Sequence, residues 1–178
     1  METIKVALIG TSSLLMHKRP PINQGKKIHD PTTKYIPEIE AKKALYEKNG
    51  KPYFPSSWIR GLLDSASKNV KKGKANLRTL FNQGISVVPP EIFLKGNPKY
   101  KIDSQWVKIQ YNMIVRTRPR FDKWQAEFSI IYEEELVDYD DIEKILNRGG
   151  HFIGLGDNRK NGYGRFKIIK FEKGSLLR

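Results

Sequence analysis

The sequence predicts an α+β fold in which strands and helices alternate within one domain, residues 1–178. Two observations carry this prediction. Apolar residues recur at every second position in some segments, as in half-buried strands, and at every third or fourth position in others, as on one face of a helix. Glycine, proline and asparagine separate these segments and mark the turns. A chain of this length can bury a substantial core.

The first half of the chain predicts a strand, a long basic loop and two helices. Residues 4–15 begin with apolar and β-branched residues, which is typical of a buried strand. Residues 17–34 are rich in basic side chains, and a loop of this length is uncommon unless it is functional or disordered. A short helix follows Pro37 and stops at Asn49-Gly50, and Pro55-Ser56-Ser57 caps a second helix.

The second half of the chain predicts strands and one further helix. Alternating apolar residues mark two strands that a short basic link joins as a hairpin, and a pair of glycines ends the helix. In chain order, these elements are an edge strand at 85–94, hairpin strands at 107–115 and 124–132, a helix at 140–148 and a strand at 164–172. This order is the split βαβ pattern of the ferredoxin-like βαββαβ sandwich, which RNA-recognition domains also use.

The charge balance indicates a polyanionic partner. Lysine and arginine together number 33 against 19 acidic residues, a formal net charge of +14. This value exceeds the magnitude of about 2–8 that is typical of a small domain. Nucleic acid and an anionic membrane surface are the two candidates. No apolar run approaches the roughly 18 residues of a spanning helix, and the N-terminus is typical of a strand rather than a signal peptide, so we expect no membrane partner.

The chain contains no cysteine, which excludes disulfides, thiolate catalysis and cysteine-ligated zinc and favours a cytoplasmic location. Its three histidines lie at no spacing that suggests a metal site. We therefore expect neither a metal nor a cofactor.

Residues 154–166 form a glycine-rich segment that alternates with charged residues before an apolar run. Glycine lacks Cβ, so the backbone there can take a positive φ and approach another chain closely. Free backbone N–H groups beside cationic side chains suit a phosphate-bearing polymer. An ordinary turn that leads into a strand is the alternative. The candidate binding residues here are Gly154, Gly156, Arg159, Lys160, Gly162, Tyr163, Gly164 and Arg165, with Tyr163 also suited to stack on a base.

Arg116, Arg118 and Arg120 occupy alternate positions at the predicted hairpin turn. Residues two apart on an extended chain point to one face, so the three guanidiniums should lie together. With Asp122 as the one nearby acid, their mutual repulsion is easier to explain if phosphates approach. The alternative is a charged turn that keeps the strand edges soluble. Weaker cationic candidates, which are more often a solvated face, are Lys18, Arg19, Lys26 and Lys27.

Residues suited to catalysis are few. His17 directly follows the first strand and could act as an acid or base in RNA cleavage through the 2′-hydroxyl. Asp30, an acid within the basic loop, could hold a metal or align an attacking hydroxyl. For His17 we favour a loop residue without a chemical role, and for Asp30 an Asp-Pro turn with local charge balance.

Residues 51–63 resemble the serine-containing helix start of the RAMP superfamily, the CRISPR-associated RNA-binding proteins, and residues 154–166 resemble its C-terminal glycine-rich loop. The first strand and the loop that holds Asp30 are similar to the opening of its backbone subunits. Pro55 meets Ser56 without the usual intervening glycine, and the chain is shorter than typical backbone subunits, as in a compact or stand-alone member.

The resemblance implies a ferredoxin-like domain that holds RNA through the sugar-phosphate backbone. It places Ser56, Ser57 and Arg60 beside that backbone, together with the glycine-rich segment. It also implies that the Arg116 to Arg120 hairpin corresponds loosely to a protruding basic hairpin. In some members of type III complexes an aspartate of the first loop cleaves target RNA, and Asp30 is the acid in the comparable place.

The sequence therefore predicts a non-catalytic protein of antiviral defence that binds RNA, or single-stranded nucleic acid, by its backbone. Its expected partners are the nucleic acid, further copies of the chain in a homo-oligomer, or other CRISPR-associated subunits of a ribonucleoprotein. Two alternatives stay open. One is an endoribonuclease that processes guides or cleaves targets with His17 or Asp30. The other is a protein-binding mimic or inhibitor that docks on a related complex.

Overall fold

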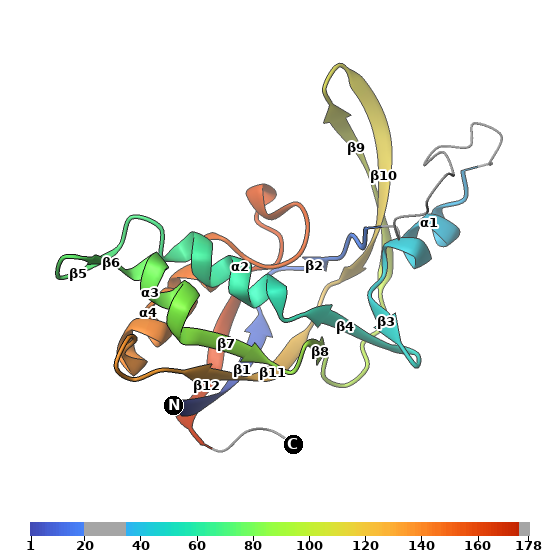
Figure 1. The fold of residues 1–178 in the computed structure, drawn as a ribbon. Helices are drawn as coiled ribbons and strands as arrows, with labels where there is room; N and C mark the ends of the chain where they lie inside the picture. The colour runs from blue at the N-terminus through green and yellow to red at the C-terminus, as the bar shows by residue number, and fades with distance from the viewer. Residues whose placement is uncertain (20–34, 175–178) are drawn as a thin grey trace, which may run out of the picture.

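The computed structural model describes residues 1–19 and 35–174 of the chain. This part is an α+β structure with four α-helices and several antiparallel sheets (Figure 1). The central sheet has the strand order β12-β1-β11-β7, and every neighbouring pair is antiparallel. Its strands are β1 (Glu2–Gly10), β7 (Ile85–Val88), β11 (Gln125–Tyr132) and β12 (Phe166–Lys173).

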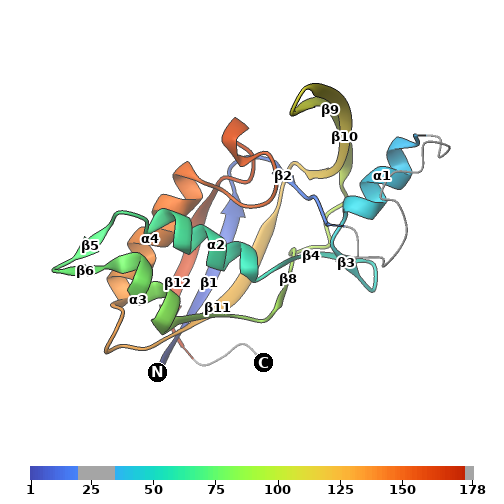
Figure 2. The same ribbon diagram turned by 45° about the horizontal axis from the view of Figure 1, so that its top comes forward.

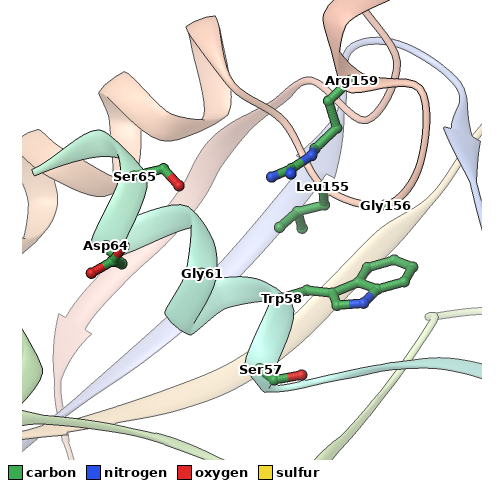
Figure 3. Close-up of a pocket in the computed structure, with 8 residues that line it drawn as sticks. All are labelled: Ser57, Trp58, Gly61, Asp64, Ser65, Leu155, Gly156 and Arg159. Carbon is green, nitrogen blue, oxygen red and sulfur yellow. The ribbon is translucent and has the colours of Figure 1, made fainter. Parts of the chain in front are cut away.

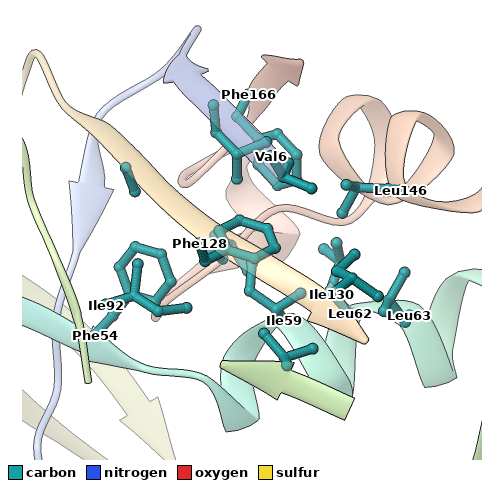
Figure 4. Packing of buried hydrophobic residues seen from close by; sticks show 14 of the residues in the cluster. Val6, Phe54, Ile59, Leu62, Leu63, Ile92, Phe128, Ile130, Leu146 and Phe166 are labelled. Carbon is teal, nitrogen blue, oxygen red and sulfur yellow. The ribbon is translucent and has the colours of Figure 1, made fainter. Parts of the chain in front are cut away.

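Two helices cover one face of the central sheet, α2 (Ser57–Ala66) between β1 and β7 in the chain and α4 (Tyr139–Phe152) between β11 and β12 (Figures 1 and 2). The inward side chains of the sheet and of both helices form one buried cluster (Figure 4). Phe128 and Ile130 of β11 are fully buried there, and Ile59 of α2 packs on the same cluster. Burying a side chain of this size stabilises the fold by about 1.5–3 kcal/mol.

A second sheet carries a long hairpin that extends away from the central sheet (Figure 1). It joins β2 (Leu14–Leu15), β10 (Asn112–Phe121) and β9 (Lys101–Ile109). The predicted hairpin between 107–115 and 124–132 is therefore wrong. Residues 116–122 belong largely to β10, and the hairpin turn lies between β9 and β10 at Gln110-Tyr111. Strand β11 pairs instead with β1 and β7.

The remaining elements are short. They are α1 (Pro37–Ala44), β3 (Glu47–Lys48), β4 (Lys51–Pro55), β5 (Lys71–Lys72), β6 (Ala75–Asn76), α3 (Leu77–Gly84), β8 (Glu91–Phe93) and a 3₁₀ turn η1 (Arg159–Asn161). The predicted strand over 85–94 divides, because β7 joins the central sheet and β8 pairs with β4. The sequence analysis missed α3, which begins where the Asn76 side chain accepts a 3.0 Å hydrogen bond from the Arg78 N–H.

Three predicted element ends differ from the structure. The strand expected over 4–15 breaks after Gly10, which packs against the Trp124 ring, and resumes in the second sheet as β2. The first helix ends at Ala44, and Asn49-Gly50 forms the turn between β3 and β4. Helix α4 continues through Gly149-Gly150, because these glycines allow close packing on Leu62 and on the Phe166 backbone rather than ending the helix.

In the part of the chain that the structure describes, no helix is long and apolar enough to cross a lipid bilayer.

Candidate nucleic-acid interface

One groove brings together the two segments that the sequence analysis singled out (Figure 3). We call it the α2 groove, and its volume is about 350 Å³. Helix α2 forms one wall and the glycine-rich segment after α4 forms the other. The lining residues are Ser57, Trp58, Gly61, Asp64, Ser65, Leu155, Gly156 and Arg159.

The helix wall of the α2 groove carries small residues, two of them polar, at a regular spacing. Ser57, Gly61 and Ser65 lie four residues apart, so they share the outer face of α2. A Cβ added at Gly61 would meet no atom within 4 Å, so this face is open. Ser56 precedes the helix without a side-chain capping bond, which corrects the predicted cap. The first N–H groups of α2 therefore keep their hydrogen-bonding capacity near the groove.

The electrostatics of the groove favour an anion. Arg159 and Lys160 are exposed on η1, and neither forms an ion pair with another residue in the described ranges. The acid of the groove, Asp64, is already paired. Arg78 Nε and Nη2 lie 2.6 and 2.9 Å from its two oxygens, and Asn82 donates a third bond at 3.1 Å. These bonds from Arg78 and Asn82 hold the pKa of Asp64 below its usual range.

Most glycines of the segment serve its own folding rather than an approach to a ligand. Gly154 and Gly164 are buried, with φ of +78° and +73°. A Cβ at Gly154 would lie 2.6 Å from the Tyr163 carbonyl oxygen, and one at Gly164 would collide with the Leu155 backbone. Neither can touch a phosphate, so their assignment to a binding surface is wrong. Only Gly162 opens to solvent, while Gly156, also at positive φ, lines the groove.

The three arginines share one face of β10, but acids occupy that face. Arg118 is only 1% exposed. Its Nη1 donates to Asp157 at 3.0 Å and its Nη2 to Gln105 at 3.1 Å, and Asp103 lies 3.7 Å away. The expectation that Asp122 is the one nearby acid is therefore wrong, and burial removes Arg118 from any binding surface.

The flanking arginines are about one-third exposed in their side chains. Arg120 Nε donates to Asp122 at 2.8 Å, and its Nη1 lies 3.4 Å from Asp103. Arg116 lies 3.8 Å from Asp157. Arg116 thus faces the glycine-rich segment, whereas Arg120 contacts acids at the root of the hairpin itself, so we infer a first role in structure for both.

Other predicted binding residues divide between structure and surface. Arg60 serves the fold itself, because its guanidinium donates hydrogen bonds to the carbonyls of Phe81, Asn82 and Ile85 at the end of α3. Tyr163 is half-buried, and its hydroxyl accepts a 3.1 Å bond from Gln105.

Two further residues of the predicted set, Arg165 and Ser56, are also partly enclosed. Arg165 is half-buried, its Nη2 donates to the Arg159 carbonyl at 3.2 Å, and its Nη1 is buried without a partner among the described residues. Ser56 is half-buried, and its backbone N–H donates to the Pro90 carbonyl at 2.8 Å.

Beyond the buried Met16, the surfaces of His17, Lys18 and Arg19 are largely exposed. Partial desolvation of the imidazole by neighbouring atoms lowers the pKa of His17 from its ordinary value of 6.5, Arg116 lowers it further, and Asp157 opposes this shift. Lys18 lies over the Tyr46 ring at 5.9 Å, and Arg19 is exposed. Lys26, Lys27 and Asp30 lie outside the described residues.

Comparison with known proteins finds likenesses among solved structures. No protein-family model matches the chain, and no curated protein matches it. Among solved structures, a chain of the "Type III-B Cmr-beta bound to cognate target RNA" is similar, with a TM-score of 0.64 over 97% of this chain. The sequences are 14% identical, so the likeness is one of fold. The present chain spans about 60% of the length of that neighbour.

The sequence analysis missed several residues of the groove, namely Trp58, Gly61, Asp64, Ser65 and Leu155. A signal for Gly61 and Ser65 was present, because small residues recur at four-residue spacing from Ser57 on the face of α2 opposite its apolar stripe. No local pattern could show that Leu155 lies against this face.

Proposed function

We propose that this chain is a RAMP-type subunit that binds the sugar-phosphate backbone of RNA, or of single-stranded nucleic acid, along the α2 groove. The observation that carries the proposal is that Ser57, Gly156 and Arg159, from the two segments of family resemblance, line one groove, and that Arg159 forms no ion pair within the described residues. A ferredoxin-like fold of the whole chain as one domain is part of the proposal. The sheet order β12-β1-β11-β7, with α2 and α4 on one face, supports it.

Affinity in this proposal comes from charge and backbone contacts. Arg159 and Lys160 neutralise phosphates, and the Ser57 hydroxyl and the first N–H groups of α2 donate hydrogen bonds to phosphate or ribose oxygens. Each phosphate that a cation neutralises releases counterions, so the affinity falls as salt rises.

The partners in this proposal are further copies of the chain or other CRISPR-associated subunits, within a cytoplasmic ribonucleoprotein. The β9–β10 hairpin supports a protein partner, because Trp106, Tyr111 and Met113 are 68%, 96% and 56% exposed on it. Exposed apolar side chains that gather on one element are typical of an interaction surface.

The test of this function compares two double variants that remove the same charge. Arg159→Ala with Lys160→Ala removes the cation that lines the groove and the exposed cation next to it on η1, and Lys5→Ala with Lys167→Ala removes two cations from the opposite face of the central sheet. Because a single strand loses about 0.7 in the logarithmic salt slope per phosphate contact, we expect the first pair to lower the slope by about 1.4. Fluorescence anisotropy of a labelled RNA at several salt concentrations measures it. Equal effects of both pairs would contradict the proposed groove.

A second candidate is endoribonuclease activity at His17. The observation that favours it is the lowered pKa of His17, which leaves the imidazole neutral at pH 7 beside Arg116 and Asp157 and able to accept a proton. Cleavage of labelled RNA by the wild type that is lost in His17→Ala would support this activity. Intact RNA with both proteins would support the binding function. Weak, non-saturating RNA binding would instead support the protein-binding alternative.

A further inference from the structure

Trp58 lies at the end of the α2 groove where the helix begins, and its side chain is half-buried (Figure 3). The ring is firmly held. The Phe54 ring stacks parallel to it at a centroid distance of 5.7 Å, and the Tyr46 ring meets it edge-on at 5.5 Å. Two such contacts fix the orientation of the indole, so the part that reaches the groove is a rigid aromatic surface.

The indole N–H of Trp58 is unused within the described residues. The buried Trp124 shows the usual arrangement, because its Nε1 donates to the Ser12 carbonyl at 2.9 Å. A tryptophan that serves only the core would be expected to find such a partner or to bury the whole ring. Trp58 instead lines the groove with a half-buried side chain, and its N–H has no hydrogen-bond partner among the described residues.

The neighbours of Trp58 suit a nucleotide. The Ser57 hydroxyl is exposed beside it, and Arg159 extends across the groove toward α2 from the opposite wall (Figure 3). An aromatic ring beside a cation and a hydroxyl matches the way proteins hold single strands, in which bases stack while cations follow the phosphates. Gly61, the next residue on this face, leaves room for the sugar because no side chain projects from it.

We propose that the Trp58 ring stacks on one nucleobase of the bound strand while Arg159 holds a neighbouring phosphate. This inference rests on the proposed function and adds a base contact to a site otherwise built for the backbone. Every base has a π-face, so the contact is tolerant of sequence.

The experiment uses the full chain carrying Trp106→Phe, so that Trp58 and the buried Trp124 are the fluorophores that remain. It is titrated with oligoadenylate and with an abasic ribose-phosphate strand of equal length. We expect oligoadenylate to quench the fluorescence and the abasic strand to bind more weakly without quenching. Trp58→Leu, which keeps an apolar side chain against Phe54, should lower oligoadenylate affinity roughly tenfold and leave abasic affinity unchanged. Trp58→Phe should keep most of the affinity.

Each contrary result is distinct. Equal loss of affinity for both strands in Trp58→Leu, or equal quenching by both strands, would overturn the stacking contact while the backbone site stands. Salt-dependent binding of oligoadenylate without quenching would do the same. Failure of both strands to bind would overturn the proposed function itself. If Trp58→Leu fails to fold, the quenching comparison and Trp58→Phe still decide.

Discussion

Arg118 offers the sharpest test of how the chain uses its arginines. Its guanidinium side chain is 2% exposed and contacts Asp157, Gln105 and Asp103. In Arg118→Met, the Asp157 carboxylate and the Gln105 amide oxygen lose a hydrogen-bond donor, and Asp103 loses a positive charge 3.7 Å away. Removing one partner of a buried ion pair costs about 3–5 kcal/mol, and the 29% exposure of the Asp157 side chain places the expected cost near 3 kcal/mol.

Thermal unfolding of the protein without nucleic acid measures this cost. A domain of this size loses about 2–4 °C in Tm per kcal/mol, so Arg118→Met should unfold about 6–12 °C lower than the wild type. Arg120→Met is the matched control, because its partly exposed pair with Asp122 contributes about 1 kcal/mol or less. A Tm within 2 °C of the wild type, together with a large loss of RNA affinity, would refute the structural role and return Arg118 to the binding surface.

Three further substitutions test the glycine-rich segment and His17. Gly156→Ala should lower both Tm and RNA affinity, because Gly156 has φ of +76° and a Cβ would collide with the Leu15 carbonyl, whereas Gly162→Ala meets open space and should cost only about 1–2 kcal/mol of backbone strain. His17→Gln should flatten the pH dependence of Tm. Since burial and Arg116 lower the pKa of His17, the unfolded chain binds the proton more tightly, and stability that is present above pH 6.5 is lost as pH falls through the folded pKa. A wild-type Tm that stays constant between pH 7 and pH 5, or falls equally in His17→Gln, would contradict this sign.

The sequence predicted an element well where the pattern within that element alone decides its structure. The apolar stripe of α2 and the alternation in β11 predicted a helix and a strand, because in each the apolar positions are the ones that become buried. The hairpin prediction was wrong because residues 116–120, with three arginines and a proline, have the local composition of a charged turn. Their acids, Asp103 and Asp157, come from β9 and from the glycine-rich segment, and only the folded chain brings them opposite the arginines.

The candidate site was only partly predicted, for the same reason. The sequence indicated each of its two walls, α2 and the glycine-rich segment. Their contact depends on packing between α2 and α4, where Gly149 allows Leu62 to approach. The glycines of the loop also show the limit of residue-type reasoning. A positive φ was correctly expected for them, yet whether the freed space admits a phosphate or the chain's own backbone depends on neighbours distant in sequence.

The distribution of side chains also argues for the face on which a strand would bind. Domains of the RNA-recognition type stack bases on aromatic residues of the open face of their sheet. Here the aromatic side chains of the central strands turn toward the helices, namely Phe128, Tyr132, Phe166 and Phe171. The register of β1 and β11 instead places Lys5 and Glu127 on the other face, where Ser129 is fully buried.

That face therefore offers charge without a stacking surface, whereas the α2 groove offers both through Arg159 and Trp58. The ferredoxin-like fold that we propose does not require the binding face of RNA-recognition domains, because the side chains that point outward determine which face binds. If Lys5→Ala with Lys167→Ala weakened RNA binding more than Arg159→Ala with Lys160→Ala, the strand would follow the sheet, and the groove would be only a packing seam between α2 and the loop.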